Sequence, residues 1–379
     1  MFDVLLSLSI SFTITFLAIP VIINVAEMKK LFDMPDARKI HQVAITPLGG
    51  IGIFAGFVFG CLLTINFRDS SSSGFQYFIA ATMVIFFLGL KDDILVLSPI
   101  KKFIGQVLAA FLIIYYGRIQ IRSMHGFFGI HELPEMFSLL ISYFSVIVII
   151  NSFNLIDGVD GLAGTLGLMS SALFGIYFMY AGMEPYYVLA FSICGSLIAF
   201  LIFNFQPAKI FMGDTGSLLI GVVNAILVLK FIDPGDGPAS LNPIISSPAI
   251  GFTILMIPLL DTLRVFAIRI FKRRSPFSPD RNHIHHLLLD RGLSHRTITL
   301  LLVAFNVSMV VFVYMARTLG CTILILSVMA VFFTFIAIAY YSRPRHSLSW
   351  AAEGNDKNEK VKESKLVTFI RESMLEQKN

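Results

Sequence analysis

The sequence predicts an all-α fold, a polytopic integral membrane helical bundle. Of its 379 residues, 56% are hydrophobic and only 14% are charged, and the mean hydropathy is +0.80. Soluble domains are typically about 45–50% apolar and about 25% charged. One soluble core of this size could not hide such an excess of apolar over charged residues. These values exclude a soluble enzyme, a disordered chain and a fibrous repeat.

Apolar segments long enough to cross a bilayer recur along the chain. Hydropathy windows of about 19 residues give eleven candidate transmembrane helices, at 4–26, 48–67, 75–91, 100–117, 137–153, 159–181, 185–204, 215–232, 248–271, 298–316 and 319–341. The first has no basic leader and no small-residue cleavage site, so we expect a retained helix and not a signal peptide. The division is therefore a membrane catalytic domain at 1–342 and a polar cytoplasmic tail at 343–379.

The basic residues predict the orientation of the bundle. With the first loop placed in the cytoplasm, the outward-facing loops hold only five of the 29 Lys and Arg residues. Cytoplasmic loops carry the excess of Lys and Arg, so we expect the N-terminus outside and the C-terminus inside. No soluble domain is left to carry the basic face that nucleic-acid binding needs, so no nucleic-acid partner is expected.

Polar motifs gather on the predicted cytoplasmic side, at the ends of the spans. They are "LGLKDD" at 88–93, "NSFNLIDGVDGLAG" at 151–164, "NFQPAKIFMGDTGS" at 204–217 and "SPDRNHIHHLLLDRGLSHR" at 278–296. Taken alone, an Asp-Asp pair often marks a solvated helix end, and Gly-Asp-x-Gly is a common turn. Together the motifs bring five carboxylates to one membrane face. A hard cation such as Mg²⁺ would neutralise them, because it typically takes one or two carboxylates plus substrate phosphate oxygens.

The second motif repeats a polar residue at every third position. Asn154, Asp157 and Asp160 would share one face of a helix, and the glycines beside them would allow close helix packing in lipid. A helix N-terminus here would also present free N–H groups to a phosphate. The alternative is an Asx-rich turn that caps the next span.

The fourth motif lies in the longest inner loop, among many basic residues. The run 272–274 has two interpretations, an anchor to anionic lipid and a binding site for anionic groups. His283, His285 and His286 have neither a cysteine nor a well-spaced third ligand beside them. Phosphate or sugar binding is therefore favoured over zinc.

The motifs combine into one hypothesis about chemistry. Asp261, inside the ninth span, is expected to pair with Arg264. Carboxylates for a metal, flexible glycine turns, and Arg, Lys and His for anions indicate a phosphoryl-transfer site at the cytoplasmic membrane surface. One substrate there can be soluble and the other a lipid. A secondary transporter is the alternative from another class, although transporters place ionisable groups near the midplane of the membrane.

The four motifs resemble those of the polyprenyl-phosphate N-acetylhexosamine-1-phosphate transferases, in particular the WecA/TagO type, which is related to MraY. The similarity begins at 31–50 and runs through 278–296. It implies transfer of a sugar-1-phosphate from a UDP-N-acetylhexosamine to polyprenyl phosphate, with release of UMP and with Mg²⁺ or Mn²⁺ as cofactor. It also implies a multi-pass protein of the bacterial cytoplasmic (inner) membrane with its active site facing the cytoplasm, and it is compatible with a homodimer.

The resemblance assigns roles to individual residues. The catalytic carboxylates would be Asp92, Asp93, Asp157 and Asp160. The substrate-binding residues would be Lys102, Asn154, Asn204, Phe211, Arg281, His283, His285 and His286. Asp214 would be the metal ligand, and Phe211 would stack on uracil. Asp92 would deprotonate the lipid phosphate while Asp93 supports the lysine or the metal. The choice between Lys101 and Lys102 for the phosphate stays open.

The histidine motif bears on the identity of the donor sugar. It reads "HIHH", where the muramoyl-peptide branch looks like "HHHFE", and so favours UDP-GlcNAc over UDP-MurNAc-pentapeptide. The second donor, that of peptidoglycan synthesis, remains the alternative. We expect a direct in-line attack by the lipid phosphate on the β-phosphorus, and the rival is a route through an aspartyl-phosphate. The product would be the first membrane intermediate of a cell-envelope polysaccharide.

Overall fold

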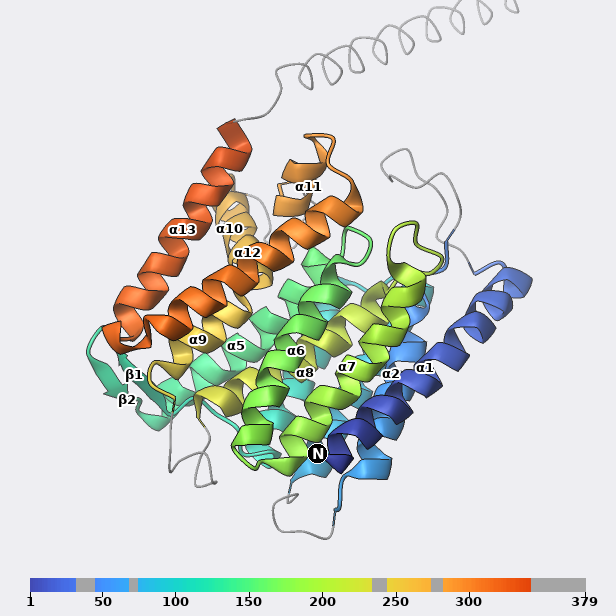
Figure 1. Ribbon diagram of the computed structural model, residues 1–379, viewed down its shortest axis with the longest axis horizontal. Helices are drawn as coiled ribbons and strands as arrows, with labels where there is room; N and C mark the ends of the chain where they lie inside the picture. Colours follow the sequence, from blue (N-terminus) through green and yellow to red (C-terminus); the bar gives the residue numbers. More distant parts are fainter. Residues whose placement is uncertain (32–44, 68–73, 234–243, 274–281, 342–379) are drawn as a thin grey trace, which may run out of the picture.

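The computed structural model is a bundle of helices, with the N-terminus and a short β-hairpin near one end and α11 near the other (Figure 1). It describes residues 1–31, 45–67, 74–233, 244–273 and 282–341. Eight helical segments in these ranges are long and apolar enough to cross a membrane. They are α1 (Phe2–Lys29), α4 with the π-helical turn that continues it (Pro99–Phe111 and Leu112–Tyr116), α5 (Glu135–Ile156), α6 (Leu162–Tyr180), α7 (Glu184–Asn204), α8 (Gly213–Ile232), α12 (His295–Met315) and α13 (Cys321–Tyr341). The predicted polytopic helical membrane fold is confirmed.

Further elements complete the described part of the chain. They are α2 (Gly49–Thr64), α3 (Phe75–Leu95), α9 (Ser247–Ile254), α10 (Met256–Phe271), α11 (Ile284–Leu289), a 3₁₀ turn (Arg317–Leu319) and the antiparallel strands β1 (Ser123–Phe127) and β2 (Ile130–Glu132). Every predicted span coincides with helical structure. The ninth span, however, was predicted as one helix and is two. The hairpin of β1 and β2 was not predicted.

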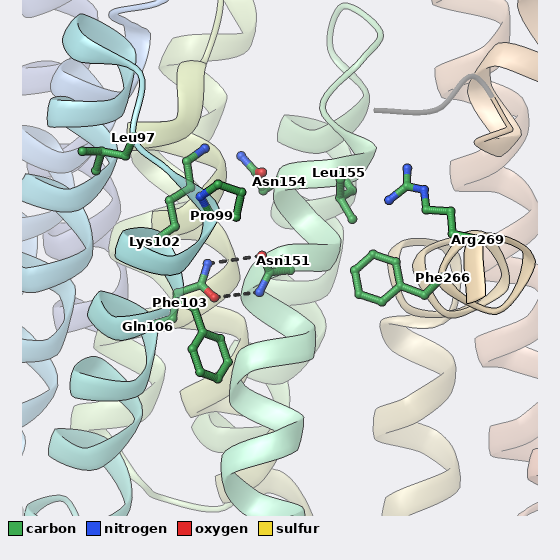
Figure 2. A pocket seen from close by; sticks show the side chains of 10 residues that line it. All are labelled: Leu97, Pro99, Lys102, Phe103, Gln106, Asn151, Asn154, Leu155, Phe266 and Arg269. Carbon is green, nitrogen blue, oxygen red and sulfur yellow. Dashed lines mark hydrogen bonds between the residues drawn. The ribbon is translucent and has the colours of Figure 1, made fainter. Parts of the chain in front are cut away.

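The break between α9 and α10 arises from Pro258 and is capped by Asn306. Pro258 has no N–H, so the Ile254 carbonyl four residues earlier loses its helical donor. The Asn306 side chain on α12 donates instead to the carbonyls of Ile254 and Thr253, each at 3.2 Å. Its Oδ1 accepts from the Ile257 N–H at 3.3 Å. Beyond the break, α10 packs against α5 and is seen nearly end-on while α5 runs upright (Figure 2).

Replacing Asn306 should therefore destabilise the fold. In Asn306→Leu, two carbonyls and one N–H lose their partner in a buried, apolar setting, where each unsatisfied group costs about 1–3 kcal/mol. We expect a clearly lower Tm in detergent. Ser308→Ala on the same helix is the control, because Ser308 is exposed and bonds only the Ala304 carbonyl of its own helix. Equal Tm values for the two variants would contradict this account of the break.

Helix α8 forms the centre of the bundle. Of its most apolar 18-residue window, 94% is buried inside the protein. A helix that is hydrophobic all round is buried on every side, which explains why its sequence lacks a polar face. Contacts with α2, α3, α5 and α6 surround it. The first turn of α8 carries Asp214, so the helix places that carboxylate where several elements meet.

Small residues let α3 approach the start of α8 closely. A Cβ added at Gly89 would lie 2.5 Å from the Cα of Thr215. Any larger residue at this position would push α3 away from α8. Close backbone approach through small residues is the usual way in which membrane helices pack. Gly89 therefore brings the end of α3, with Asp92 and Asp93, directly beside the first turn of α8.

Candidate active site

Asp93 joins the C-terminal end of α3 to the N-terminus of α8. Its Oδ1 accepts from the Asp214 N–H at 2.7 Å, and its Oδ2 accepts from the N–H and the hydroxyl of Thr215 at 3.0 and 2.5 Å. Free N–H groups at a helix N-terminus favour such a carboxylate. Gly213 has φ +68°, and a Cβ there would lie 2.7 Å from the Asp93 carboxylate. Asp93 thus fixes the backbone that carries Asp214, and its described contacts do not include the lysine that the motif resemblance suggested.

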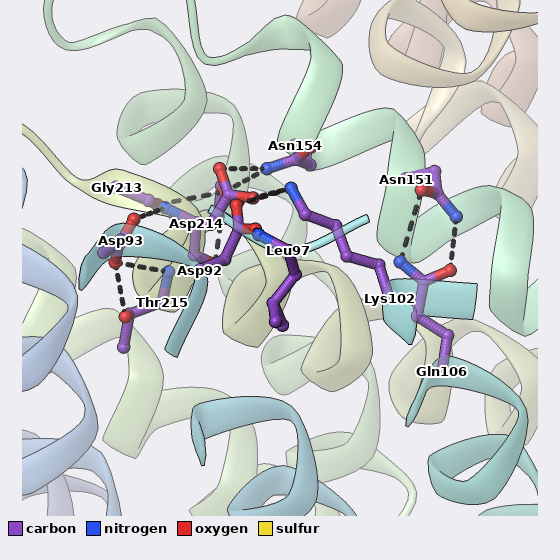
Figure 3. Close-up of polar contacts among 11 residues, drawn as sticks. Asp92, Asp93, Leu97, Lys102, Gln106, Asn151, Asn154, Gly213, Asp214 and Thr215 are labelled. Carbon is purple, nitrogen blue, oxygen red and sulfur yellow. Dashed lines mark hydrogen bonds and ion pairs between the residues drawn. The ribbon is translucent and has the colours of Figure 1, made fainter. Parts of the chain in front are cut away.

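Lys102, on the first turn of α4, lies between two carboxylates. Its Nζ is 2.6 Å from Asp92 Oδ2 and 2.5 Å from Asp214 Oδ2 (Figure 3). Asp92 Oδ1 in addition accepts from the Leu97 N–H, which ties the α3–α4 connection to the same site. The three side chains of the ion pairs are only 11–26% exposed. Of the two candidate lysines, Lys102 is the one in this network, whereas Lys101 is exposed.

Asn154 brings α5 to the same carboxylate. Its Nδ2 donates to Asp214 Oδ1 at 2.9 Å and to Ser217 Oγ at 3.0 Å. Figure 3 shows Asn154 and Lys102 reaching Asp214 together. Helices α3, α4, α5 and α8 therefore meet at one side chain.

The prediction that Asn154, Asp157 and Asp160 share a helical face is wrong. Helix α5 ends at Ile156 and α6 begins at Leu162, so both aspartates lie in a turn. Gly161, with φ +78° in the left-handed region, is the N-cap residue directly before α6. The turn still brings the acids to the site, in agreement with the alternative of an Asx-rich turn.

Asp157 lies among other carboxylates, which affect its pKa. Burial, together with the carboxylates of Asp214, Asp93 and Asp160, raises the pKa of Asp157 to about 8. The ordinary value is about 3.9. Because the folded-state pKa is raised, the fold favours the protonated acid, and the associated stability is lost as the pH rises from about 4 to about 8. A cation in the site would oppose this loss.

Neutralising Asp157 should therefore stabilise the metal-free protein. We expect Asp157→Asn to raise the Tm, and the difference from the parent should grow between about pH 5 and pH 8, since only the parent carries an ionising carboxyl there. Thermal unfolding in detergent with a metal chelator measures both. Adding Mg²⁺ should raise the Tm of the parent more than that of the variant. A Tm difference that shrinks as the pH rises would contradict this interpretation.

Asp160 and Asn204 hold the turn in place. The Asp160 N–H donates to His295 Nδ1 at 3.2 Å, and the same His295 nitrogen is 3.3 Å from Asp160 Oδ2. Asn204 Oδ1 accepts from the Gly161 N–H at 2.9 Å, and its Nδ2 donates to the Ile210 carbonyl at 2.8 Å. Both ends of the Asn204 amide therefore bind backbone groups. The structure gives Asn204 a positioning role, and its predicted contact with substrate stays a prediction.

The histidine loop is anchored by Asp261. This fully buried carboxylate accepts from Arg264 at 2.8 Å, which confirms the pair predicted from the sequence. It also lies 2.8 Å from His283 Nδ1 and accepts from the Ile284 N–H at 2.9 Å. Arg264 bonds the Asn282 carbonyl as well. Asp261 thus joins α10 to the start of α11.

His285 docks this loop onto the acidic turn. Its ring lies so close to Gly158 that a Cβ added there would overlap His285 Nε2. Within the described residues, His285 Nδ1 is buried without a hydrogen-bond partner. Burial and the neighbouring His286 lower the pKa of His285 to about 3, so the ring is neutral. His283 and His285 are 4% and 2% exposed, while His286 is half-buried beside them.

A cavity opens next to Lys102, with a volume of about 140 Å³. Its lining residues are Leu97, Pro99, Lys102, Phe103, Gln106, Asn151, Asn154, Leu155, Phe266 and Arg269 (Figure 2). They come from the α3–α4 connection, α4, α5 and α10. Half of these side chains are apolar, and Lys102 and Arg269 add cationic groups. The cavity could take a molecule with an anionic head and an apolar body.

Two further residues, Phe211 and Arg281, were also predicted to bind substrate. Phe211 is half-buried in the segment before α8, where its N–H donates to the Thr46 carbonyl at 2.9 Å and its carbonyl accepts from the Gly49 N–H at 3.0 Å. Arg281 lies outside the described residues.

Some residues of the site were not predicted. The motifs did not single out Gln106 and Asn151, or His295 as the partner of Asp160. His295 was inside the quoted fourth motif, but nothing in its spacing pointed to the turn at 157–161. Only the packing of α12 beside that turn reveals the contact.

Fold and site together define a class: a polytopic membrane protein with carboxylates and a lysine gathered at one end of its helical bundle, beside a partly apolar cavity. The family model described as glycosyl transferase family 4 matches residues 75–232, which span α3 to α8. The chain belongs to this family, and within it to the undecaprenyl-phosphate N-acetylglucosaminyl 1-phosphate transferases, as the sequence motifs indicated.

Three relatives illustrate the similarity. An undecaprenyl-phosphate alpha-N-acetylglucosaminyl 1-phosphate transferase of Yersinia pestis is 33% identical over 271 residues, 70% of this chain and 71% of that protein. The protein of the same name from Escherichia coli K12 is 30% identical over 278 residues, 72% of this chain and 73% of its own length. A probable undecaprenyl-phosphate N-acetylglucosaminyl 1-phosphate transferase of Bacillus subtilis is 29% identical over 344 residues, 89% of this chain and 92% of that protein.

Proposed function

We propose that this protein transfers GlcNAc-1-phosphate from UDP-GlcNAc to undecaprenyl phosphate and releases UMP, as the first membrane step of a cell-envelope polysaccharide pathway. One observation carries the proposal: Lys102, held between Asp92 and Asp214, lies at the wall of a partly apolar cavity between α4, α5 and α10. The names of the relatives support the same reaction and the same lipid.

The cavity supplies the lipid end of the site. Phe103, Leu155 and Phe266 give it apolar walls, and Lys102 gives it a cation. A polyprenyl phosphate has the matching chemistry, with a hydrocarbon chain and an anionic phosphate head. An ammonium group binds phosphate oxygens through charge-assisted hydrogen bonds. The lipid phosphate would therefore displace part of the carboxylate contact that Lys102 makes in the free protein.

In this proposal Asp92 would accept the proton of the lipid phosphate. The second pKa of a phosphate monoester is about 6, so a monoanion bound beside Asp92 can give up its remaining proton. The freed oxygen attacks the β-phosphorus of UDP-GlcNAc in line. A new P–O bond forms, the bond from the β-phosphorus to the bridging oxygen breaks, and its electron pair leaves with UMP. Lys102 then faces the charge that gathers on the transferred phosphoryl group.

Mg²⁺ is the proposed cofactor. In the described residues, no group of three or more His, Cys, Asp or Glu side chains has the geometry to hold a metal alone. Mg²⁺ needs only one or two carboxylates when substrate phosphates supply further oxygens, and the carboxylates of Asp214, Asp93 and Asp160 add to the burial that raises the pKa of Asp157. Asp214 and Asp157 would hold it. Once bound, it would neutralise the pyrophosphate and the departing UMP.

The nucleotide-sugar end is proposed to lie between the acidic turn and α11. Phe211 would stack on uracil, and Arg281, His283, His285 and His286 would form the loop that faces the pyrophosphate and the sugar. Because His283 contacts Asp261 of α10 and His285 packs against Gly158 of the acidic turn, His286 is the most accessible of the three rings. We further propose a location in the bacterial cytoplasmic membrane with this site facing the cytoplasm, and a homodimer as the assembly.

A turnover assay tests the proposed function. Purified protein with UDP-GlcNAc, undecaprenyl phosphate and Mg²⁺ should release UMP, and Asp214→Ala should abolish the release. Metal chelation should also stop it. UDP-MurNAc-pentapeptide in place of UDP-GlcNAc should give no turnover. UMP released at the same rate without any lipid acceptor would contradict the transferase.

A further inference from the structure

Two amide side chains form a reciprocal pair at the wall of the cavity. Gln106 on α4 donates through Nε2 to Asn151 Oδ1 at 3.2 Å, and Asn151 on α5 donates through Nδ2 to Gln106 Oε1 at 2.7 Å (Figure 3). Asn151 Nδ2 also donates to the Ile147 carbonyl at 2.8 Å. Gln106 is 2% exposed. The geometry defines both the spacing and the relative rotation of the two helices, because both bonds must form at once.

The pair lies one helical turn from the two groups that bind Asp214. Gln106 is four residues after Lys102 on α4, and Asn151 is three residues before Asn154 on α5, so each shares a helix face with its neighbour. Figure 2 shows these four side chains along one wall of the cavity, with the hydrogen-bonded pair next to Lys102 and Asn154. Lys102 and Asn154 in turn take the two oxygens of the same carboxylate.

Other contacts do not explain the pair. Lys102 reaches Asp214 from α4, and Asn154 reaches it from α5. Neither bond fixes the distance between the two helices one turn further along, where Gln106 and Asn151 line the cavity. Hydrogen bonds between membrane helices contribute little to net stability on average. Two amides that line a cavity from mainly apolar helices therefore need a role beyond helix adhesion.

We propose that Gln106 and Asn151 are positioning residues: their amide pair sets α4 against α5 so that Lys102 and Asn154 hold Asp214 together while the cavity stays open. The pair acts through Lys102 and Asn154 and takes no part in bond making. The proposal rests on the proposed function only for its kinetic consequence. Its structural part, the confinement of Lys102, can be measured without turnover.

Acetylation of lysines tests that confinement. Purified protein is treated briefly with acetic anhydride, and the modification of Lys102 relative to the adjacent, exposed Lys101 is measured by tandem mass spectrometry. In the parent, Lys102 should react far more slowly than Lys101. Gln106→Leu and Asn151→Leu should each raise the Lys102 to Lys101 ratio several-fold. The exchange variant Gln106→Asn with Asn151→Gln keeps the total length of the pair, so its ratio should return close to that of the parent.

Kinetics and stability complete the experiment. The single leucine variants should lose at least about tenfold in kcat, since a displacement of about 1 Å can cost more than that, and the KM for UDP-GlcNAc should change little. The exchange variant should recover most of the kcat. Asn224→Leu is the matched control: Asn224 is a buried amide that links α8 to Ser171 of α6 at 3.2 Å. It should leave the lysine ratio unchanged.

Two results would overturn the proposal. One is an unchanged lysine ratio in both single variants that remain folded by Tm. The other is an exchange variant that folds and yet has the ratio and the kcat of the single variants. If the parent shows no turnover, the proposed function fails, and the lysine ratio still decides whether the pair confines Lys102.

Discussion

Lys102→Gln is expected to reduce UMP release by about a hundredfold to a thousandfold, because it removes the cation that faces the phosphates. It also leaves Asp92 and Asp214 near each other without their shared counter-ion, and breaking a partly buried ion pair from one side is strongly destabilising. The structure gives Lys102 contacts of 2.5 and 2.6 Å to these carboxylates. No other lysine in the described residues lies in this network.

The adjacent residue offers a sharp control. Lys101 has the same charge and lies on the same helix, but its side chain is exposed. Lys101→Gln should therefore keep activity within about twofold, in line with the small effects of most surface substitutions. Rates are compared at saturating UDP-GlcNAc over a range of undecaprenyl phosphate. Equal losses in the two variants would show that the basic end of α4 acts only through its total charge.

Asp92→Asn is the second large effect that we expect. A positioned general base contributes about 10²–10⁴-fold in rate, and asparagine cannot accept the proton of the lipid phosphate. The amide oxygen can still accept from the Leu97 N–H, and Lys102 keeps Asp214 as its ion-pair partner, so the Tm should change little. The main loss should be in kcat and not in the KM for UDP-GlcNAc.

The neighbouring carboxylate should behave differently. Asp93 uses both oxygens to accept three hydrogen bonds from Asp214 and Thr215, and asparagine offers only one acceptor oxygen. Asp93→Asn should therefore lower the Tm as well as the rate. A variant of Asp93 with parental Tm, or one of Asp92 with parental rate, would contradict the division of roles between the two acids.

The sequence was most informative where one physical rule applied to the whole chain. Apolar length predicted the helices, because a bilayer requires long apolar segments. The position of the polar motifs at span ends predicted that Asp92, Asp157 and Asp214 would come together at one end of the bundle, as they do. The Asp261–Arg264 pair was accessible from the sequence because residues three apart on a helix are neighbours.

Other features depended on tertiary contacts that no local pattern encodes. The turn at 157–161 is fixed by Asn204 and His295, which come from distant parts of the chain. The break after α9 needs Asn306 from another helix as well as the proline within α10. Spacing alone could not separate Asp92 from Asp93, since only the fold decides which carboxylate meets the lysine and which caps α8.

The residues of the amide pair were missed for a related reason. Gln106 lies outside the quoted motifs, and Asn151 is the first residue of one motif without a spacing that suggests a partner. Each is an ordinary polar residue in a mainly apolar helix when it is considered alone. Their hydrogen bonds to each other become evident only in the fold, where α4 and α5 lie side by side (Figure 2).

The central claim is a direct transfer from nucleotide to lipid at the site formed by Asp92, Lys102 and Asp214. A single-turnover experiment with excess enzyme and UDP-GlcNAc labelled with ³²P at the β-phosphate tests it most directly. With undecaprenyl phosphate and Mg²⁺, the label should move from the nucleotide sugar to the lipid in step with UMP release, and without the lipid it should stay in UDP-GlcNAc. Label bound covalently to the protein in the absence of lipid, or UMP formed without labelled lipid, would contradict the account.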